Sequence, residues 1–197
     1  MIDIYMYYYD DYEYVYNYLD LCNLESTYIN NNYEKFRNKS TQYDTTIFIY
    51  KDMNILAIMS SRAIYLNKLK GIFLLQKVNL LDKKIFKSIF EHDISKNLCN
   101  VKIDIDVLGS EEELIEFEGA KLQELNLLEE YDLYDKESET VLTSYSIQPT
   151  GYKYALQISS VNKLQFSDKY NTSDIEDIIS KLIIIIKLVK EVEQNIE

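Results

Sequence analysis

The chain has 197 residues, of which 47% are hydrophobic and 27% charged, a composition typical of a folded globular protein with a sizeable core. Its net charge of −12 disfavours general binding to nucleic acid. Apolar runs such as Leu182–Ile186 are far shorter than the roughly 20 residues of a membrane-spanning helix. Two cysteines are too few for a disulfide framework, and the acidic N-terminus does not resemble a secretory leader, so we expect a cytoplasmic protein.

The N-terminal segment is rich in tyrosine, with eight of the 19 tyrosines lying within residues 5–18. We expect a strand over residues 1–9 and a helix over residues 11–23, which Asp10 would cap. The tyrosines can form a stacking platform for bases or sugars, or they can pack half-buried with their hydroxyls at the surface. The second interpretation is favoured because the acids among them would repel a phosphate backbone. The polar residues 25–42 predict a short helix and loops.

Residues 45–50 are β-branched and aromatic, which favours a strand. A turn over residues 51–54 would return the chain as a longer strand over residues 55–66. Residues 72–78 would add a third strand, and the three together would form an antiparallel meander. Asp82 then begins a helix. One face of this helix is apolar and consists of Ile85, Phe86, Ile89 and Phe90.

Residues 101–107 alternate between apolar and polar side chains and predict a half-buried strand. A Gly-Ser break follows. A capping-box spacing, with three glutamates in the first turn, then predicts a helix over residues 111–118. Gly119 would end this helix. Two further strands are expected over residues 122–134 and 140–147.

The only proline, Pro149, marks the boundary that we predict between a domain over residues 1–148 and an extension over residues 149–197. Residues 152–159 would add an edge strand. The clearest element is a helix over residues 173–194, whose apolar stripe comprises Ile175, Ile178, Ile179, Leu182, Ile183, Ile186 and Val189. Such a stripe either covers the sheet of its own domain or meets another chain, for example in a homodimer.

Charge is distributed unevenly along the chain. Residues 104–139 hold 14 acids and two bases, whereas residues 62–102 hold nine bases and three acids. The acidic block, residues 104–139, can attract a basic partner, or it can serve as a solvated, solubilising face. Its candidate partner-binding residues are Glu111, Glu112, Glu113, Glu116 and Glu118. No calcium-loop or zinc spacing accompanies them, so we expect no metal there.

The predicted order of elements resembles the GNAT superfamily of acyl-CoA N-acyltransferases over residues 1–147. The most specific part of the likeness is the strand 101–107, the helix 111–118 and the Gly119-Ala120-Lys121-Leu122 entry to the next strand. The resemblance implies a mixed α/β fold with a largely antiparallel central sheet flanked by helices, here with an added C-terminal helix. It also implies acetyl-CoA as cofactor, its pyrophosphate bound by a glycine-rich turn and the N-terminus of the following helix.

Two positions depart from the pattern of this family. Residues 78–85, which match the phosphate-binding turn, contain no glycine and place Asp82 where an anion would lie. The lysines that can contact the phosphates, or else form a solvated basic surface, are Lys83, Lys84 and Lys87. The tyrosine that the family often uses as a general acid is replaced by Ile115, which cannot donate a proton.

The single histidine, His92, has an acid on each side and could join Cys99 or Cys22 in a nucleophile–histidine–acid set. A surface histidine at a helix end is the preferred interpretation.

Two functional hypotheses follow. In the first, the protein is non-catalytic and binds another protein with a basic surface, using no cofactor; an inhibitory, immunity or counter-defence role would fit. In the second, it is an N-acyltransferase that binds acetyl-CoA through the three lysines. The missing glycine turn and Ile115 favour the first hypothesis.

Overall fold

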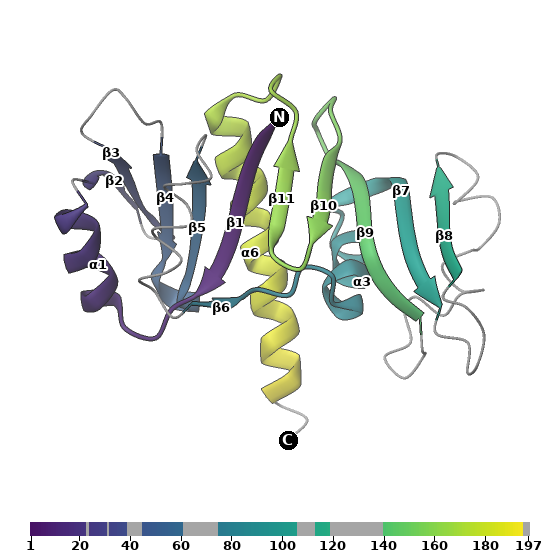
Figure 1. Cartoon of the computed structure of the whole chain (residues 1–197), viewed down its shortest axis with the longest axis horizontal. Helices are drawn as coiled ribbons and strands as arrows, with labels where there is room; N and C mark the ends of the chain where they lie inside the picture. The colour runs from purple at the N-terminus through teal and green to yellow at the C-terminus, as the bar shows by residue number, and fades with distance from the viewer. Residues whose placement is uncertain are drawn as a thin grey trace. The chain divides into compact units, whose positions relative to one another are not determined.

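The computed structural model of the protein describes residues 1–22, 24–30, 32–38, 45–60, 75–105, 113–118 and 140–194. These residues form a mixed α/β fold with three α-helices, the last of them near the C-terminus (Figure 1). The chain divides into two compact units, residues 1–78 and 79–197, and the strand pairings inside each unit are antiparallel. The predicted α/β class, with a largely antiparallel sheet and a C-terminal helix, is therefore confirmed.

The first unit is an antiparallel sheet with one helix packed on it. Its strands are β1 (Ile2–Tyr8), β2 (Leu24–Ile29), β3 (Glu34–Asn38), β4 (Thr45–Tyr50), β5 (Ile55–Ser60) and β6 (Gln76–Lys77). They lie in the order β2-β3-β4-β5-β1, and β6 also pairs with β1. Helix α1 (Tyr12–Leu21) buries Val15 and Leu19 in a cluster with Phe36 and Ile47 of the sheet, so one core of this unit lies between α1 and a sheet face.

Local signals explain both ends of α1 and the hairpin after β4. The helix cap is Asp11 rather than the expected Asp10, because the Asp11 carboxylate accepts a hydrogen bond from the backbone N–H of Glu13 at 2.8 Å. The predicted turn between β4 and β5 is confirmed. Residues 51–53 form a 3₁₀ turn, and Asn54 closes it in the left-handed conformation with a φ of 50°, which asparagine tolerates better than most residues.

The segment 25–42, expected to hold a short helix and loops, contains a β-hairpin instead. β2 and β3 pair antiparallel, with a register shift at Thr27. In β3, Glu34 and Phe36 are buried while the residues between and after them are more exposed, which is the period of two that a strand requires. The expected meander is also wrong in one respect, because β6 pairs with β1. Parts of the second and third strands expected there lie outside the described residues.

The second unit combines a five-stranded antiparallel sheet with two helices. Its strands are β7 (Ser95–Ile105), β8 (Glu113–Glu118), β9 (Thr140–Pro149), β10 (Leu156–Ser160) and β11 (Lys163–Phe166), in the order β11-β10-β9-β7-β8. Helix α3 (Lys83–Glu91) packs against α6 (Thr172–Gln194) and β7. An ion pair between Lys84 and Glu193, with an N–O distance of 2.5 Å, links the two helices.

Both helices of this unit follow the sequence prediction closely. Asp82 caps α3 by accepting a hydrogen bond from the backbone N–H of Lys84 at 2.7 Å, and the predicted apolar face of α3 is buried at Ile85, Phe86 and Ile89. The predicted stripe of α6 is buried along its whole length within this chain. Only Ile184 and Val192 leave large apolar side chains exposed on α6. The cap of α6 is Asn171, whose side chain accepts the backbone N–H of Asp174 at 2.9 Å.

The helix predicted over residues 111–118 is wrong. Residues 113–118 form β8, an antiparallel strand beside β7, in which Ile115 lies opposite Ile103 and Phe117 opposite Val101. Pairing with an existing strand satisfies the backbone hydrogen bonds of this segment and sets apolar residues across from one another. This long-range pairing overrides the capping-box signal, which measures only local preference. The strand expected over residues 122–134 lies outside the described residues.

The C-terminal third contains one strand more than predicted. β10 was expected at an edge, but it lies between β9 and β11, and the short β11 was not predicted. The compact units divide after Val78. Pro149, where we placed the boundary, ends β9 inside the second unit. The turn that follows uses Gly151 with a φ of +88°, a conformation that favours glycine.

Candidate functional site

The turn between β6 and α3 is where an acyltransferase would bind the pyrophosphate of its coenzyme. Six backbone N–H groups of residues 78–86 already donate hydrogen bonds inside the chain. The acceptors are Met6 O for Val78 (3.2 Å), Val161 O for Leu80 (2.5 Å), Asn79 Oδ1 for Leu81 (3.2 Å), Asn79 O for Asp82 (3.3 Å), Asp82 Oδ1 for Lys84 (2.7 Å) and Asp82 O for Phe86 (2.9 Å). Four of these hydrogen bonds lie within the turn, and the other two reach β1 and the connection between β10 and β11. We call this segment the closed turn.

A phosphate site of the expected kind needs N–H groups that face the ligand at the start of a helix. Here the Asp82 carboxylate occupies that position on α3 and carries the same sign of charge as a phosphate. Binding a diphosphate would require at least Leu80, Leu81 and Lys84 to give up their present N–H bonds. This geometry counts against coenzyme binding at the turn.

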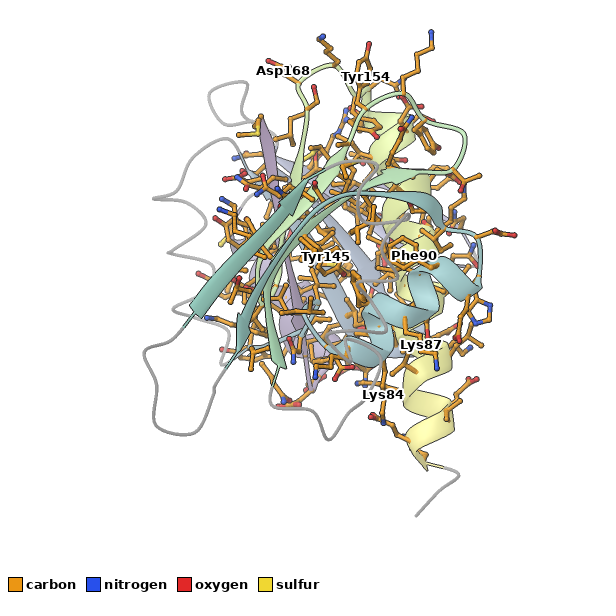
Figure 2. All side chains as sticks on the ribbon, turned by 90° about the vertical axis from the view of Figure 1, so that its right-hand side faces the viewer. Lys84, Lys87, Phe90, Tyr145, Tyr154 and Asp168 are labelled. Atoms are coloured by element: carbon orange, nitrogen blue, oxygen red, sulfur yellow. The ribbon has the colours of Figure 1, made fainter. Side chains whose placement is uncertain are left out.

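The three candidate phosphate lysines lie on the first turns of α3, as predicted, but two are engaged with acids. Lys84 pairs with Glu193 of α6, and Lys87 pairs with Glu91 one turn further along α3 at 3.7 Å. Figure 2 shows Lys84 and Lys87 on α3, beside α6. The first of these pairs joins two helices, so it has a structural role without any ligand.

The candidate acidic residues lie partly on β8. Glu113, Glu116 and Glu118 belong to this strand, with Glu116 in register with Lys102 of β7, whereas Glu111 and Glu112 lie outside the described residues. Among the described residues, β8 pairs with β7 alone. The three described glutamates are thus spread along a strand and not gathered on the first turn of a helix.

The members of the candidate nucleophile–histidine set lie on three different segments of the chain. His92 is an exposed residue at the C-terminal end of α3, which is the interpretation preferred above. Cys99 lies in β7, where burial raises the pKa of its thiol and so lowers the thiolate fraction. Cys22 follows α1, in the other compact unit.

Sequence reasoning missed a polar cluster in the first unit, the Glu34 cluster of Tyr12, Glu34 and Lys51. The Tyr12 hydroxyl donates a hydrogen bond to Glu34 Oε2 at 2.5 Å, and Lys51 Nζ lies 3.0 Å from the same oxygen. Lys51 Nζ also lies 4.1 Å from the centroid of the Tyr12 ring. Only 4% of the Glu34 side chain is exposed, so these groups replace water around a buried carboxylate.

The electrostatics of the Glu34 cluster follow from this geometry. Burial alone raises the pKa of Glu34, but hydrogen bonds from Tyr12, Ser26 and Lys51 outweigh it, and the pKa falls below its usual value. The pKa of Lys51 is raised by its contact with Tyr12 and by the Glu34 charge. Burial raises the pKa of the neighbouring Tyr9 to about 12, and the Tyr9 hydroxyl has no hydrogen-bond partner among the described residues. The cluster is charged at neutral pH and ties α1, β3 and the β4–β5 turn together.

The second unit contains a similar arrangement, the Asp177 cluster of Tyr152, Asp177 and Lys181. The Tyr152 hydroxyl donates to Asp177 Oδ2 at 2.6 Å, and Lys181 Nζ lies 2.6 Å from that oxygen. Burial, followed by the hydrogen bond to Asp177, raises the pKa of Tyr152. Burial raises the pKa of Asp177, but the hydrogen bonds from Lys181 and Tyr152 and the charge of Lys181 lower it by more, so the pKa falls below its usual value. Tyrosine and carboxylate lie 25 positions apart, so no local motif could reveal the pair.

Within the described ranges, no group of three or more His, Cys, Asp or Glu residues is placed to hold a metal ion. No helix in the described part of the chain is long and apolar enough to cross a membrane. Comparison with known proteins gives no match: no family model, no curated protein and no solved structure is similar to this chain.

Proposed function

We propose that the protein is a non-catalytic binding protein whose acidic block docks on a basic surface of another protein. The observation that carries the proposal is the concentration of 14 acids and two bases within residues 104–139. Three of these acids, Glu113, Glu116 and Glu118, lie along β8, which is at the edge of the sheet that the described residues form. Charged residues on an edge strand oppose pairing with a second copy and favour a partner of opposite charge.

Two further features support binding over group transfer. The turn that would hold a coenzyme pyrophosphate uses six of its N–H groups internally, and the Asp82 carboxylate caps the N-terminus of α3. The order β1, α1, antiparallel strands, α3 and β7 is the part of the acyltransferase-like order that the described residues retain, and we propose a degenerate scaffold of that kind. Its two free cysteines suit a reducing compartment such as the cytoplasm.

Charge reversal at β8 tests this proposal. We expect the variant Glu113→Lys/Glu116→Lys/Glu118→Lys to bind a partner purified with the wild-type chain at least tenfold more weakly at about 0.1 M salt, because three attractive charges become repulsive. Surface plasmon resonance at several salt concentrations measures the loss, which should shrink as salt rises. The matched control reverses three exposed acids of the first unit, Asp10, Glu13 and Asp20. Equal affinities for the β8 variant and the wild type would remove this strand from the interface.

The alternative is an N-acyltransferase that binds acetyl-CoA through Lys83, Lys84 and Lys87. Isothermal calorimetry of acetyl-CoA against the full chain is expected to give no saturable heat in the micromolar range, because the N–H groups of the turn are already bonded. Micromolar binding that disappears when the three lysines become alanine would establish the enzyme. Its control replaces the exposed lysines Lys77, Lys153 and Lys187 instead.

A further inference from the structure

We propose that three tyrosines at one end of the second unit form a binding site for a lysine or arginine side chain of another protein. Tyr152 and Tyr154 follow β9, and Tyr170 precedes α6; together they are the tyrosine cluster. Tyr170 lies at the centre, with its ring centroid 5.9 Å from that of Tyr152 and 5.8 Å from that of Tyr154. Figure 2 labels Tyr154, which lies on the connection between β9 and β10. Tyr154 is 37% exposed, so its ring can be reached from solvent.

The rings of the tyrosine cluster are held in place by the surrounding structure. The Tyr170 hydroxyl donates a hydrogen bond to the backbone carbonyl of Tyr154, and the Tyr152 hydroxyl donates to Asp177. Phe166 of β11 packs edge-on against Tyr170, with 5.4 Å between ring centroids. A surface that is fixed before binding loses little conformational entropy when a ligand arrives.

Two of these rings already accept an ammonium group from the chain itself. Lys169 Nζ lies 5.3 Å from the centroid of Tyr154, and Lys181 Nζ lies 5.5 Å from that of Tyr152. Both distances are within the roughly 6 Å at which a cation is attracted to the face of an aromatic ring. Lys181 is also bound by Asp177, but Lys169 forms no ion pair with any described residue. The contact of Lys169 is therefore one that a partner's cation can replace.

Carboxylates around the rings favour a cationic ligand over a nucleic acid. The Asp177 carboxylate accepts the Tyr152 hydroxyl, and Asp168 and Asp174 lie two residues before and four residues after Tyr170 in the sequence. Asp174 forms no ion pair within the described structure. Burial raises the pKa of Tyr170 to about 12, and the charge of Asp174 is the second-largest cause of this rise. The Asp174 carboxylate therefore lies near that ring. Aromatic rings beside carboxylates suit an ammonium or guanidinium group, whereas a phosphate backbone would be repelled.

The site is separate from the acidic block and extends the proposed function to a second contact. β8 pairs with the C-terminal half of β7, whereas the tyrosine cluster follows Pro149, which is in register with Ser95 at the other end of β7. The two sites can therefore be tested independently.

The test uses an acetylated tetra-arginine peptide as probe and the full chain labelled with ¹³C in its tyrosine rings. Titration followed by NMR is expected to shift the ring signals of Tyr152 and Tyr154 saturably. Tyr154→Leu should weaken this binding at least fivefold, and Tyr154→Phe should retain it, because a phenyl face also attracts cations. Lys169→Ala should strengthen binding about two- to fivefold, since it removes the competing ammonium. Tyr14→Leu, at an exposed tyrosine of α1, is the matched control.

Several outcomes would overturn the proposal. Equal affinity in Tyr154→Leu and wild type means that the ring does not bind the probe. Unchanged or weaker binding of the peptide to Lys169→Ala means that Lys169 does not compete with the peptide for the Tyr154 ring. Loss of the Tyr154 shifts in the triple lysine variant of β8 would assign the peptide to the acidic block. Preferential binding of an oligothymidine at the same signals would identify a stacking platform instead.

Discussion

Replacing Glu34 with alanine is expected to lower the free energy of unfolding of the first unit by about 2–4 kcal/mol. The carboxylate is buried and receives the Tyr12 hydroxyl at 2.5 Å and the Lys51 ammonium at 3.0 Å. Alanine removes both contacts and leaves the Tyr12 hydroxyl without its acceptor. Urea unfolding measures the loss, and hydrogen exchange at the amides of β3 and α1 locates it. The amides of β9 and β10, in the other unit, serve as the internal reference.

Three variants separate the contributions inside the Glu34 cluster. Glu34→Gln keeps an acceptor for Tyr12 and should cost less than alanine, while Tyr12→Phe removes only the donor. The double variant Tyr12→Phe/Glu34→Gln should show a coupling of about 0.5–3 kcal/mol between the two residues. Asp20→Ala, at an exposed acid of α1, is the matched control. A loss below about 0.5 kcal/mol for Glu34→Ala would mean that the cluster does not hold the unit together.

The contribution of Glu34 depends on pH in a defined direction. Because its folded-state pKa lies below the usual value of 4.5, the carboxylate binds protons less readily in the folded than in the unfolded chain. Its stabilisation is fully present above the unfolded pKa and is lost as the pH falls through the folded pKa. The stability difference between wild type and Glu34→Gln should therefore stay constant from pH 7 down to about 5 and shrink below that. A difference that grows on acidification would contradict the downward shift.

Elements whose signal lies in a continuous pattern could be predicted from the sequence. Helix α6 shows an apolar stripe at helical spacing over about four turns, and the stripe is buried where expected. Helix α3 carries both an N-cap and an apolar face, so two independent signals agree. The strands β1, β4 and β9 were likewise identified from their β-branched and aromatic residues.

The errors in the two segments that were predicted as helix and form strands have a common cause. β2 with β3, and β8 with its glutamates, carry many charged residues on short strands, so the alternating apolar pattern is weak. β8 is stabilised by pairing with β7. The closest pair in the sequence is Ile105 with Glu113, eight positions apart, and the other pairs are more widely separated. A capping-box spacing is a local preference of about 1 kcal/mol, which strand pairing exceeds. Short polar strands of this kind are determined by their neighbours in the sheet.

The polar clusters could not be predicted because their members meet only in the folded chain. Glu34 lies in a segment that looked like a solvated loop, yet it is 3% exposed. Its partners Tyr12 and Lys51 are on different elements, and each is one of many similar residues in the sequence. The signal that could have identified Glu34 is its place two positions before Phe36, because a strand puts residues two apart on the same face.

Replacing Phe86 with alanine is expected to lower the free energy of unfolding of the second unit by about 3–5 kcal/mol, the largest effect of any substitution considered. Phe86 is fully buried on α3, and its ring meets the ring of Tyr145 edge-on with 4.9 Å between centroids. Phe90, 5.2 Å away on the same helix, is only partly buried, so Phe90→Ala should cost less and serves as the control. Urea unfolding compares the two variants.

Tyr145, which packs against Phe86, connects the core of the second unit to the closed turn. The Tyr145 hydroxyl, in the interior of the unit (Figure 2), donates a hydrogen bond to the carbonyl oxygen of Leu80 at 2.9 Å, and burial raises its pKa, so it stays a donor at any pH the fold tolerates. Tyr145→Phe keeps the ring and removes only this bond, which should cost about 1–2 kcal/mol. It should also speed hydrogen exchange at the amides of Leu80 and Leu81 more than at those of α6.

This variant also tests whether the closed turn conceals a phosphate site. If the N–H groups of the turn were a cradle held shut by Tyr145, loosening it in Tyr145→Phe would raise the affinity for acetyl-CoA. We expect no such gain, because Asp82 still caps α3 and its charge opposes a phosphate whether the turn is tight or loose. Saturable coenzyme binding by Tyr145→Phe, abolished by adding Lys84→Ala, would show that the turn opens into a working site and would end the non-catalytic proposal.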